Sequence, residues 1–190
     1  MSWHRKRIKL VAYTIGALTT AVLAVSTSPA AASGTYSGRA YVWGNSTLFW
    51  EDWENEGILQ RDTHAYSNAT CLWQRILWAD GKLTSTTAID GIFGNGTYNA
   101  TRAWQQAEND EWEGLVHIAV DGSVGKETFT RAGFNLEATG GSSDPGQTLY
   151  LRYAGKSYNF NLRRLADGNY EFVDGDGAWR KAGYNYRTCS

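Results

Sequence analysis

One short phrase occurs twice in this chain, at residues 90–97 and 121–128. Both copies read Asp-Gly-x-apolar-Gly-x-x-Thr, and both lead directly into a helical pattern. Glycine at two fixed positions indicates backbone conformations that disfavour a Cβ atom, often because φ is positive. Asp before Gly is typical of tight turns, and Thr is a good helix N-cap. The phrase therefore predicts a tight turn, one buried apolar anchor and a helix start. The predicted turn and cap residues are Asp90, Gly91, Phe93, Gly94 and Thr97, then Asp121, Gly122, Val124, Gly125 and Thr128.

Residues 1–32 have the pattern of a secretory signal peptide. A basic stretch at 4–9 precedes a mostly apolar stretch at 10–25, and Ala30-Ala31-Ala32 is typical of a cleavage site. We therefore expect a secreted protein, extracellular or associated with the cell wall. After cleavage no stable membrane insertion is expected, and a retained N-terminal anchor is the alternative.

The net charge of the mature chain limits the classes of partner that it is expected to bind. Residues 1–32 hold four of the 18 Lys and Arg residues and none of the 19 Asp and Glu, which leaves 14 against 19, a net charge of −5. A mildly acidic chain of about 158 residues is a poor nucleic-acid binder. The full sequence has nine Trp and 11 Tyr residues beside one Met, which favours an aromatic core, or aromatic surfaces that bind sugars or peptides.

The two cysteines, Cys71 and Cys189, predict a disulfide, because an exported chain meets an oxidising compartment. Closing a loop of this length is worth roughly 4–5 kcal/mol in the chain-entropy model. Two unrelated thiols are the alternative. No Cys/His cluster of metal-site type is present in the sequence, so neither a metal nor another cofactor is expected.

The rest of the mature chain divides by pattern into four segments, of the α+β class. Residues 33–66 form a Trp-rich N-terminal segment with a candidate short strand at 39–43. Residues 67–136 are expected to form a small domain of three helices, beginning near Thr70, Thr97 and Thr128. Residues 137–147 have the composition of a Gly/Ser linker. In residues 148–190 the apolar period changes to two, which predicts an antiparallel β-meander of three or four strands.

The helical segment resembles a known family, the peptidoglycan-binding domains of the "PG_binding_1" type. That family has a Leu-Gln helix, a DG-x-FG-x-x-T turn, an Ala-x-x-x-Phe-Gln helix and a second DG-x-x-G-x-x-T turn. The matching residues run in the same order here: 72–77 with Gly81, 90–94 with Thr97, Ala100 with Trp104-Gln105, then Gly114-Leu115, 120–125 and Thr128. Trp104 stands where the family usually has Phe, the stretch 108–120 is longer and more acidic than usual, and Cys71 is an addition. The resemblance implies a non-catalytic three-helix module, common on secreted cell-wall hydrolases, that holds them to peptidoglycan. The Ala-rich export signal fits a bacterial, actinobacterial-like source.

Peptidoglycan offers sugar rings and short peptides with carboxylates, which suit aromatic faces and amide side chains. The ligand-binding candidates are therefore Gln74, Trp78, Tyr98, Arg102, Gln105 and Trp112. Tyr98 and Arg102 lie off the apolar stripe of their helix, so we expect them to be exposed. For Trp78 and Trp112 a place in the core or at an interface is an equal alternative.

We find no motif for catalysis. Two His residues remain in the mature chain without a flanking ligand motif, and neither Ser-x-x-Lys nor Gly-x-Ser-x-Gly occurs. Acidic clusters at 51–56 and 108–113 offer pairs of carboxylates for a glycosidase, but such runs are usually solvated. The main hypothesis is a secreted, non-enzymatic peptidoglycan binder. The alternatives are a secreted interaction or inhibitor protein that binds a protein partner through the β-meander, and a small cell-wall lytic enzyme.

Overall fold

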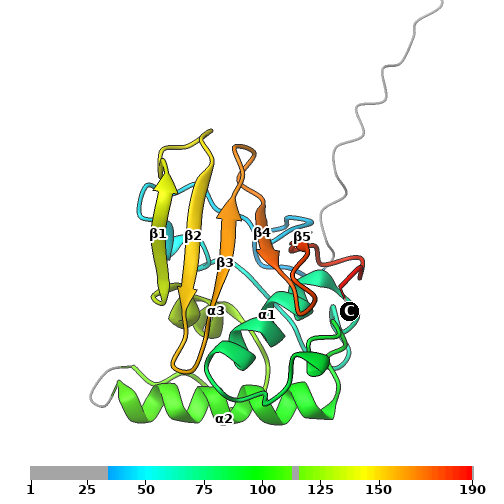
Figure 1. The fold of residues 1–190 in the computed structure, drawn as a ribbon. Helices are drawn as coiled ribbons and strands as arrows, with labels where there is room; N and C mark the ends of the chain where they lie inside the picture. The colour runs from blue at the N-terminus through cyan, green and yellow to red at the C-terminus, as the bar shows by residue number, and fades with distance from the viewer. Residues whose placement is uncertain (1–33, 113–115, 190) are drawn as a thin grey trace, which may run out of the picture.

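The computed structural model of this chain describes residues 34–112 and 116–189. Helices come first and an antiparallel sheet follows, so the α+β class is confirmed (Figure 1). The α-helices of the described part are α1 (Asn68–Ala79), α2 (Asn95–Glu111) and α3 (Lys126–Gly133). Two short 3₁₀ helices, η1 (Phe49–Glu51) and η2 (Thr86–Ala88), lie in the connections. The predicted signal peptide lies outside the described residues.

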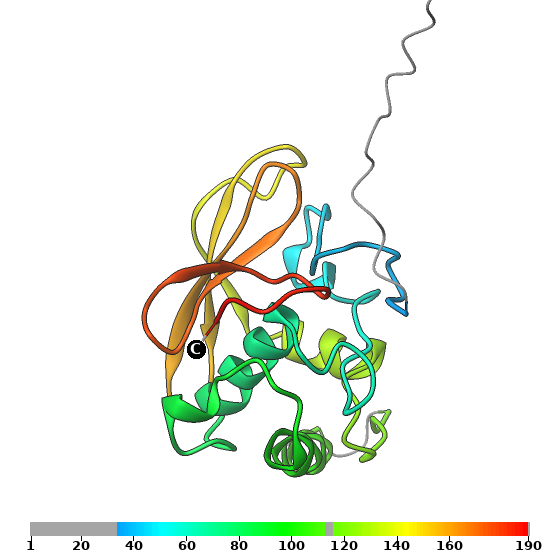
Figure 2. The ribbon, with the colours of Figure 1, turned by 90° about the vertical axis from the view of Figure 1, so that its right-hand side faces the viewer.

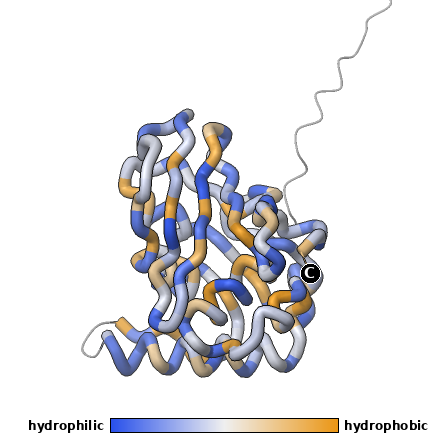
Figure 3. Tube along the Cα trace, viewed as in Figure 1, coloured by the Kyte–Doolittle hydropathy of each residue, from blue (hydrophilic) through white to orange (hydrophobic). Residues whose placement is uncertain are grey.

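The sheet is an antiparallel meander with strands in chain order. Its strands are β1 (Leu136–Gly141), β2 (Leu149–Ala154), β3 (Asn159–Arg164), β4 (Tyr170–Val173) and β5 (Trp179–Lys181). Hydrophobic and hydrophilic residues alternate along β2 and β3 (Figure 3). Leu149, Leu151 and Tyr153 are buried while Tyr150 and Arg152 are exposed, as expected for a sheet with one solvated face.

The sheet has five strands rather than the three or four predicted. The extra strand, β1, occupies much of the predicted linker at 137–147. Its Gly-rich end still pairs with β2, and Gly141 lies opposite Leu149. Strand pairing uses backbone groups, so a segment poor in large side chains joins a sheet when its neighbour supplies the partner N–H and C=O groups.

The helices and the sheet share one hydrophobic core. Helix α1 contacts β2 and β3, and the helices lie on one side of the sheet (Figure 2). At the centre of this core, the Trp73 ring packs edge to face on the rings of Trp104 and Phe129, with ring centroids 5.1 Å and 5.9 Å apart. Phe129 also meets Trp53 of the N-terminal segment at 6.0 Å. The aromatic content of the chain is therefore used largely as core.

The N-terminal segment is joined to the sheet by backbone hydrogen bonds. The amide of Val42 donates to the carbonyl of Ala182 at 2.9 Å, and the amide of Tyr170 donates to the carbonyl of Val42 at 2.9 Å. The candidate strand at 39–43 is present only as isolated bridges at Tyr41 and Trp43. At the other end of the chain, the predicted disulfide between Cys71 and Cys189 is present and ties α1 to the C-terminal segment. No helix in the described ranges is long and apolar enough to cross a membrane.

Candidate functional site

Each repeated turn is held by one glutamine from the preceding helix. The side-chain amide of Gln74 donates to Asp90 Oδ1 (2.8 Å), to the carbonyl of Ile92 (3.1 Å) and to Thr97 Oγ1 (3.0 Å). Its Oε1 accepts from the amide of Gly91 at 2.7 Å. One side chain thus contacts four groups of the first turn, with the two N–H bonds of its amide shared among three acceptors.

Gln105 repeats this arrangement in the second turn, 31 residues later. It donates to Asp121 Oδ1 (3.3 Å), to the carbonyl of Ser123 (2.8 Å) and to Thr128 Oγ1 (3.2 Å), and accepts from the amide of Gly122 at 2.9 Å. The sequence repeat is therefore a structural repeat that includes the glutamine.

The two glutamines are scaffold residues, which differs from their prediction as ligand contacts. Gln74 and Gln105 are each 1% exposed. Both amide atoms of each side chain are already bonded inside the protein, and Gln74 also borders a small hollow of about 190 Å³ beside the first turn. Their occurrence 31 residues apart, in register with the repeated phrase, was the sequence signal for this role.

Two details of the turns differ from the sequence prediction. The N-caps are Gly94 and Gly125, and Thr97 is the third residue of α2. Its hydroxyl accepts from Gln74 and donates to the carbonyl of Ile92 at 3.2 Å, and Thr128 sits at the matching position of α3. Gly91 and Gly122 have positive φ (69° and 76°), whereas Gly94 and Gly125 have φ of −88° and −96°.

A groove lies beside the second turn. It has a volume of about 260 Å³ and is lined by Gln60, Arg61, Asp62, Tyr98, Asp121 and Ser123; we call it the turn groove. Tyr98 is half-buried: its ring lies close over Gly122, and the Arg61 guanidinium stacks on it at 4.2 Å. Arg102, one helical turn later on α2, is exposed, and its Nε donates to the carbonyl of Val120 at 3.3 Å.

The turn groove thus brings Tyr98 together with residues that sequence reasoning missed. Arg61 and Asp62 carry no motif, and they come from the N-terminal segment, which Leu59 joins to the second turn by paired backbone hydrogen bonds with Val124. That pairing of distant segments is not visible in a single sequence.

The two tryptophan candidates lie elsewhere. Trp78, on α1, stacks on Tyr158 at 4.3 Å between ring centroids, and the Arg75 guanidinium lies 4.3 Å from its ring. Trp112, at the end of α2, packs near Phe134 at 5.9 Å and Arg131 at 4.8 Å. Both are half-buried, so the predicted ligand residues do not form one cluster.

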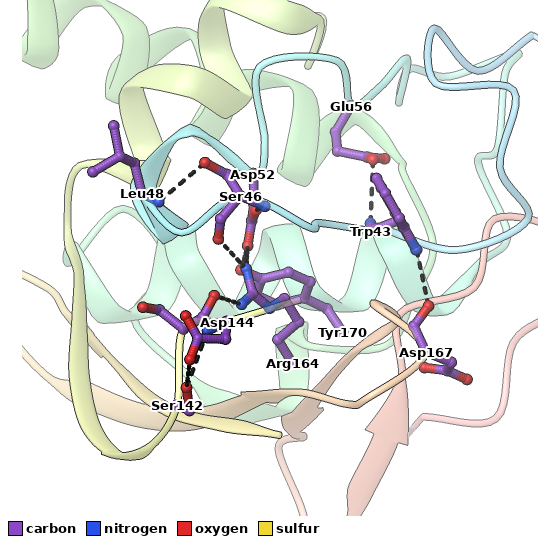
Figure 4. A network of polar contacts seen from close by, with 11 residues as sticks. Trp43, Ser46, Leu48, Asp52, Glu56, Ser142, Asp144, Arg164, Asp167 and Tyr170 are labelled. Atoms are coloured by element: carbon purple, nitrogen blue, oxygen red, sulfur yellow. Dashed lines mark hydrogen bonds and ion pairs between the residues drawn. The ribbon is translucent and has the colours of Figure 1, made fainter. Parts of the chain in front are cut away.

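A cleft larger than the turn groove lies along the N-terminal segment, away from the predicted ligand residues. This cleft has a volume of about 510 Å³, and its lining includes Tyr36, Arg39, Trp43, Glu51, Asp52 and Glu56. Figure 4 shows the polar network that holds its walls. Arg164, buried at the end of β3, donates to Asp52 Oδ2 and to the carbonyls of Ser46 and Ser143, each at 2.7 Å.

The two buried carboxyl groups of this cleft have different surroundings. Burial raises the pKa of Glu56 to about 8, although hydrogen bonds from Tyr184 and from the amide of Trp43 act in the opposite direction, so Glu56 is neutral at pH 7. Asp52 is paired with Arg164 and accepts further hydrogen bonds from Tyr170 Oη (2.6 Å) and the amide of Ser46 (2.8 Å). A buried carboxylate with such partners is a structural anchor.

No family model, curated protein or solved structure matches this chain. Among the residues that the structure describes, no group of three or more His, Cys, Asp or Glu side chains is arranged to hold a metal ion.

Proposed function

We propose that this protein is a secreted, non-catalytic binder of peptidoglycan, and that the turn groove contacts the ligand. The observation that carries the proposal is the module of two glutamine-held turns, whose sequence resembles a peptidoglycan-binding family. The disulfide is consistent with an extracellular protein, and secretion belongs to the proposal.

The chemistry of the turn groove suits a peptide that carries carboxylates and amide groups. Arg61 supplies donors, Asp62 and Asp121 supply acceptors, and Tyr98 supplies an aromatic face. Arg102 lies beside the groove, next to Tyr98 at Gly122, and adds an exposed guanidinium at its edge. Arg61 is preorganised by stacking on Tyr98, and a guanidinium held in this way loses less entropy when it binds a carboxylate in two-point fashion. The stem peptide of peptidoglycan has these groups.

The buried carboxyl groups support the non-catalytic part of the proposal. Glycoside hydrolysis by two carboxyl groups needs one protonated acid and one ionised carboxylate facing the substrate. Glu56 meets the first requirement, but Asp52 has both oxygens bonded to Ser46, Arg164 and Tyr170. Using Asp52 as a base or nucleophile would break a buried ion pair.

Co-sedimentation of the mature protein with purified insoluble peptidoglycan tests the proposal. We expect saturable depletion from the supernatant. Arg102→Ala should raise the apparent Kd about tenfold, because a hydrogen bond between charged groups is lost at an exposed position. Lys82→Ala, which removes a cation outside the turn groove, is the matched control and should bind as the wild type does.

No depletion of the wild-type protein would refute the proposal. If the Arg102→Ala and Arg61→Ala variants are depleted as strongly as the wild type, the turn groove is not the site that binds peptidoglycan. A cleared band on a cell-wall zymogram would favour the lytic enzyme. Capture of a defined protein partner without cell-wall material would favour the interaction protein.

A further inference from the structure

The outer face of the sheet, which points away from the helices, carries two exposed aromatic rings beside one hollow. Tyr150 on β2 is 49% exposed and Trp179 on β5 is 41% exposed. Together with Thr139 of β1 and Asn161 of β3 they border a hollow of about 320 Å³. We call Thr139, Tyr150, Asn161 and Trp179 the outer platform. Both aromatic side chains stand on strands, so a packed sheet fixes their positions.

The strand charges around the outer platform cancel in pairs. Arg152 of β2 is paired with Glu137 of β1, and its Nε donates to Glu137 Oε2 at 3.1 Å. Arg163 of β3 donates from Nε to Glu171 Oε2 of β4 at 2.7 Å, and its guanidinium lies 4.4 Å from the Trp179 ring.

Beyond these pairs, Lys181 of β5 lies opposite Glu171 of β4, and its Nζ is 5.9 Å from the Tyr41 ring. The hollow itself is therefore lined by neutral residues: two aromatic rings, one amide, one hydroxyl and the two leucines Leu151 and Leu162.

We propose that the outer platform binds a neutral polysaccharide, a chain of β-linked pyranose rings. Three observations carry this assignment. Exposed aromatic rings on a rigid sheet offer flat faces for the C–H faces of sugar rings. The amide of Asn161 and the hydroxyl of Thr139 can both donate and accept, as sugar hydroxyls require. The paired charges leave no net charge at the hollow to select an ionic ligand.

This site is separate from the turn groove and does not depend on the function proposed there. An exposed aromatic pair on a sheet can also serve a protein partner, which usually brings a larger contact area and charged groups at its rim. The uncharged lining of the hollow favours the sugar.

Titration of the uniformly ¹⁵N-labelled mature protein with two soluble probes, followed by two-dimensional NMR, tests the inference. The probes are the hexasaccharides of β-1,4-linked glucose and of β-1,4-linked N-acetylglucosamine, which show whether the acetamido group matters. We expect saturable shifts, with a millimolar Kd or better, at the amides of the outer platform.

Trp179→Ala and Tyr150→Ala should each weaken binding about tenfold, as expected for one lost aromatic contact. Both side chains are exposed, so both variants should fold, and their spectra report this directly. Tyr66→Ala removes a 68%-exposed aromatic residue outside the outer platform and should leave the Kd unchanged. Arg102→Ala, the variant used in the peptidoglycan assay, should also leave the Kd for the hexasaccharides unchanged. The two experiments therefore report on separate sites.

Absence of saturable shifts with both probes up to about 10 mM, well above a millimolar Kd, would overturn the inference. So would shifts elsewhere, or unchanged binding in both Trp179→Ala and Tyr150→Ala. Concentration-dependent self-association that Trp179→Ala abolishes would instead identify a second copy of this chain as the occupant.

Discussion

The carboxyl group of Glu56 is 1% exposed and lies between the main chain of Trp43 and the ring of Tyr184. Tyr184 Oη donates to Glu56 Oε2 at 2.5 Å and accepts from the amide of Gly57 at 3.0 Å. These bonds do not offset the loss of hydration, so the neutral form is favoured and the pKa is raised to about 8. Folding therefore makes Glu56 bind a proton that the unfolded chain releases near pH 4.5.

The raised pKa of Glu56 predicts a fall in stability with rising pH. Between about pH 4.5 and 8 the folded state holds one more proton at Glu56 than the unfolded state does. The free energy of unfolding should therefore decrease by about 1.4 kcal/mol per pH unit across this window and level off above it. Urea denaturation at pH 5, 6.5 and 8 measures the slope.

Glu56→Gln is the matched control, because it keeps the shape of the side chain and removes the titration. The unfolding free energy of the wild type minus that of the variant should decrease by about 1.4 kcal/mol per pH unit. A difference that stays constant from pH 5 to 8 would contradict the assignment. Burial also raises the pKa of Glu108, and this contribution cancels in the difference.

At the scale of secondary-structure elements, each turn depends on one glycine more than on the other. Gly91 has a φ of +69°, and a Cβ there would lie 2.8 Å from Cys189 Sγ and 2.9 Å from Arg187 Cγ. Gly94 has a φ of −88°, and no atom lies within 4 Å of a Cβ built on it. Only the first glycine of the phrase is required by geometry in this turn.

The same substitution at the two positions should therefore have different effects on stability. Gly91→Ser should lower the free energy of unfolding by about 1–3 kcal/mol, from a left-handed backbone and crowding against the C-terminal segment. Gly94→Ser places a good N-cap at the start of α2 and should be neutral or slightly stabilising. Chemical denaturation of both variants measures this, and equal losses at Gly91 and Gly94 would refute the distinction.

At this scale the sequence predicted local features well and distant pairings poorly. The α+β class, the disulfide and the alternation of β2 and β3 were readable, because they depend on local period or on two cysteines. Strand β1 could not be predicted from the sequence, because its Gly-rich end pairs through its backbone. The burial of Asp52 and Glu56 could not be predicted from the sequence. The partner of Asp52, Arg164, lies 112 residues away, and the partner of Glu56, Tyr184, lies 128 residues away. The turn groove was only half predicted, since Arg61 reaches Tyr98 through tertiary packing.

At the scale of the whole molecule, the helical segment and the sheet are joined by buried polar contacts. Asp80, at the end of α1, accepts from Trp104 Nε1 at 2.6 Å, from Tyr153 Oη at 2.7 Å and from the amide of Lys156 at 3.0 Å. The carbonyl of Ala79 accepts from the amides of Ser157 and Tyr158. If the sheet were removed, Asp80 would keep only its bond from Trp104, and the carbonyl of Ala79 would lose both of these partners.

We therefore predict that residues 67–136, the segment predicted from sequence as a helical domain, do not fold alone. The isolated segment loses the sheet that covers α1 and the N-terminal segment that pairs with the second turn. The NMR spectrum of the isolated segment should show poor dispersion. The mature chain should unfold in one transition, with the same midpoint by tryptophan fluorescence and by circular dichroism.

The disulfide needs its own control, because the isolated segment contains Cys71 without Cys189. A mature chain carrying Cys71→Ser and Cys189→Ser should keep a dispersed spectrum and lose about 4–5 kcal/mol of stability in the chain-entropy model. If that chain is folded and the segment is not, the loss of packing against the sheet and the N-terminal segment explains the difference. A well-dispersed spectrum from the isolated segment would show instead that the helices form an autonomous domain, to which the sheet is an appendage.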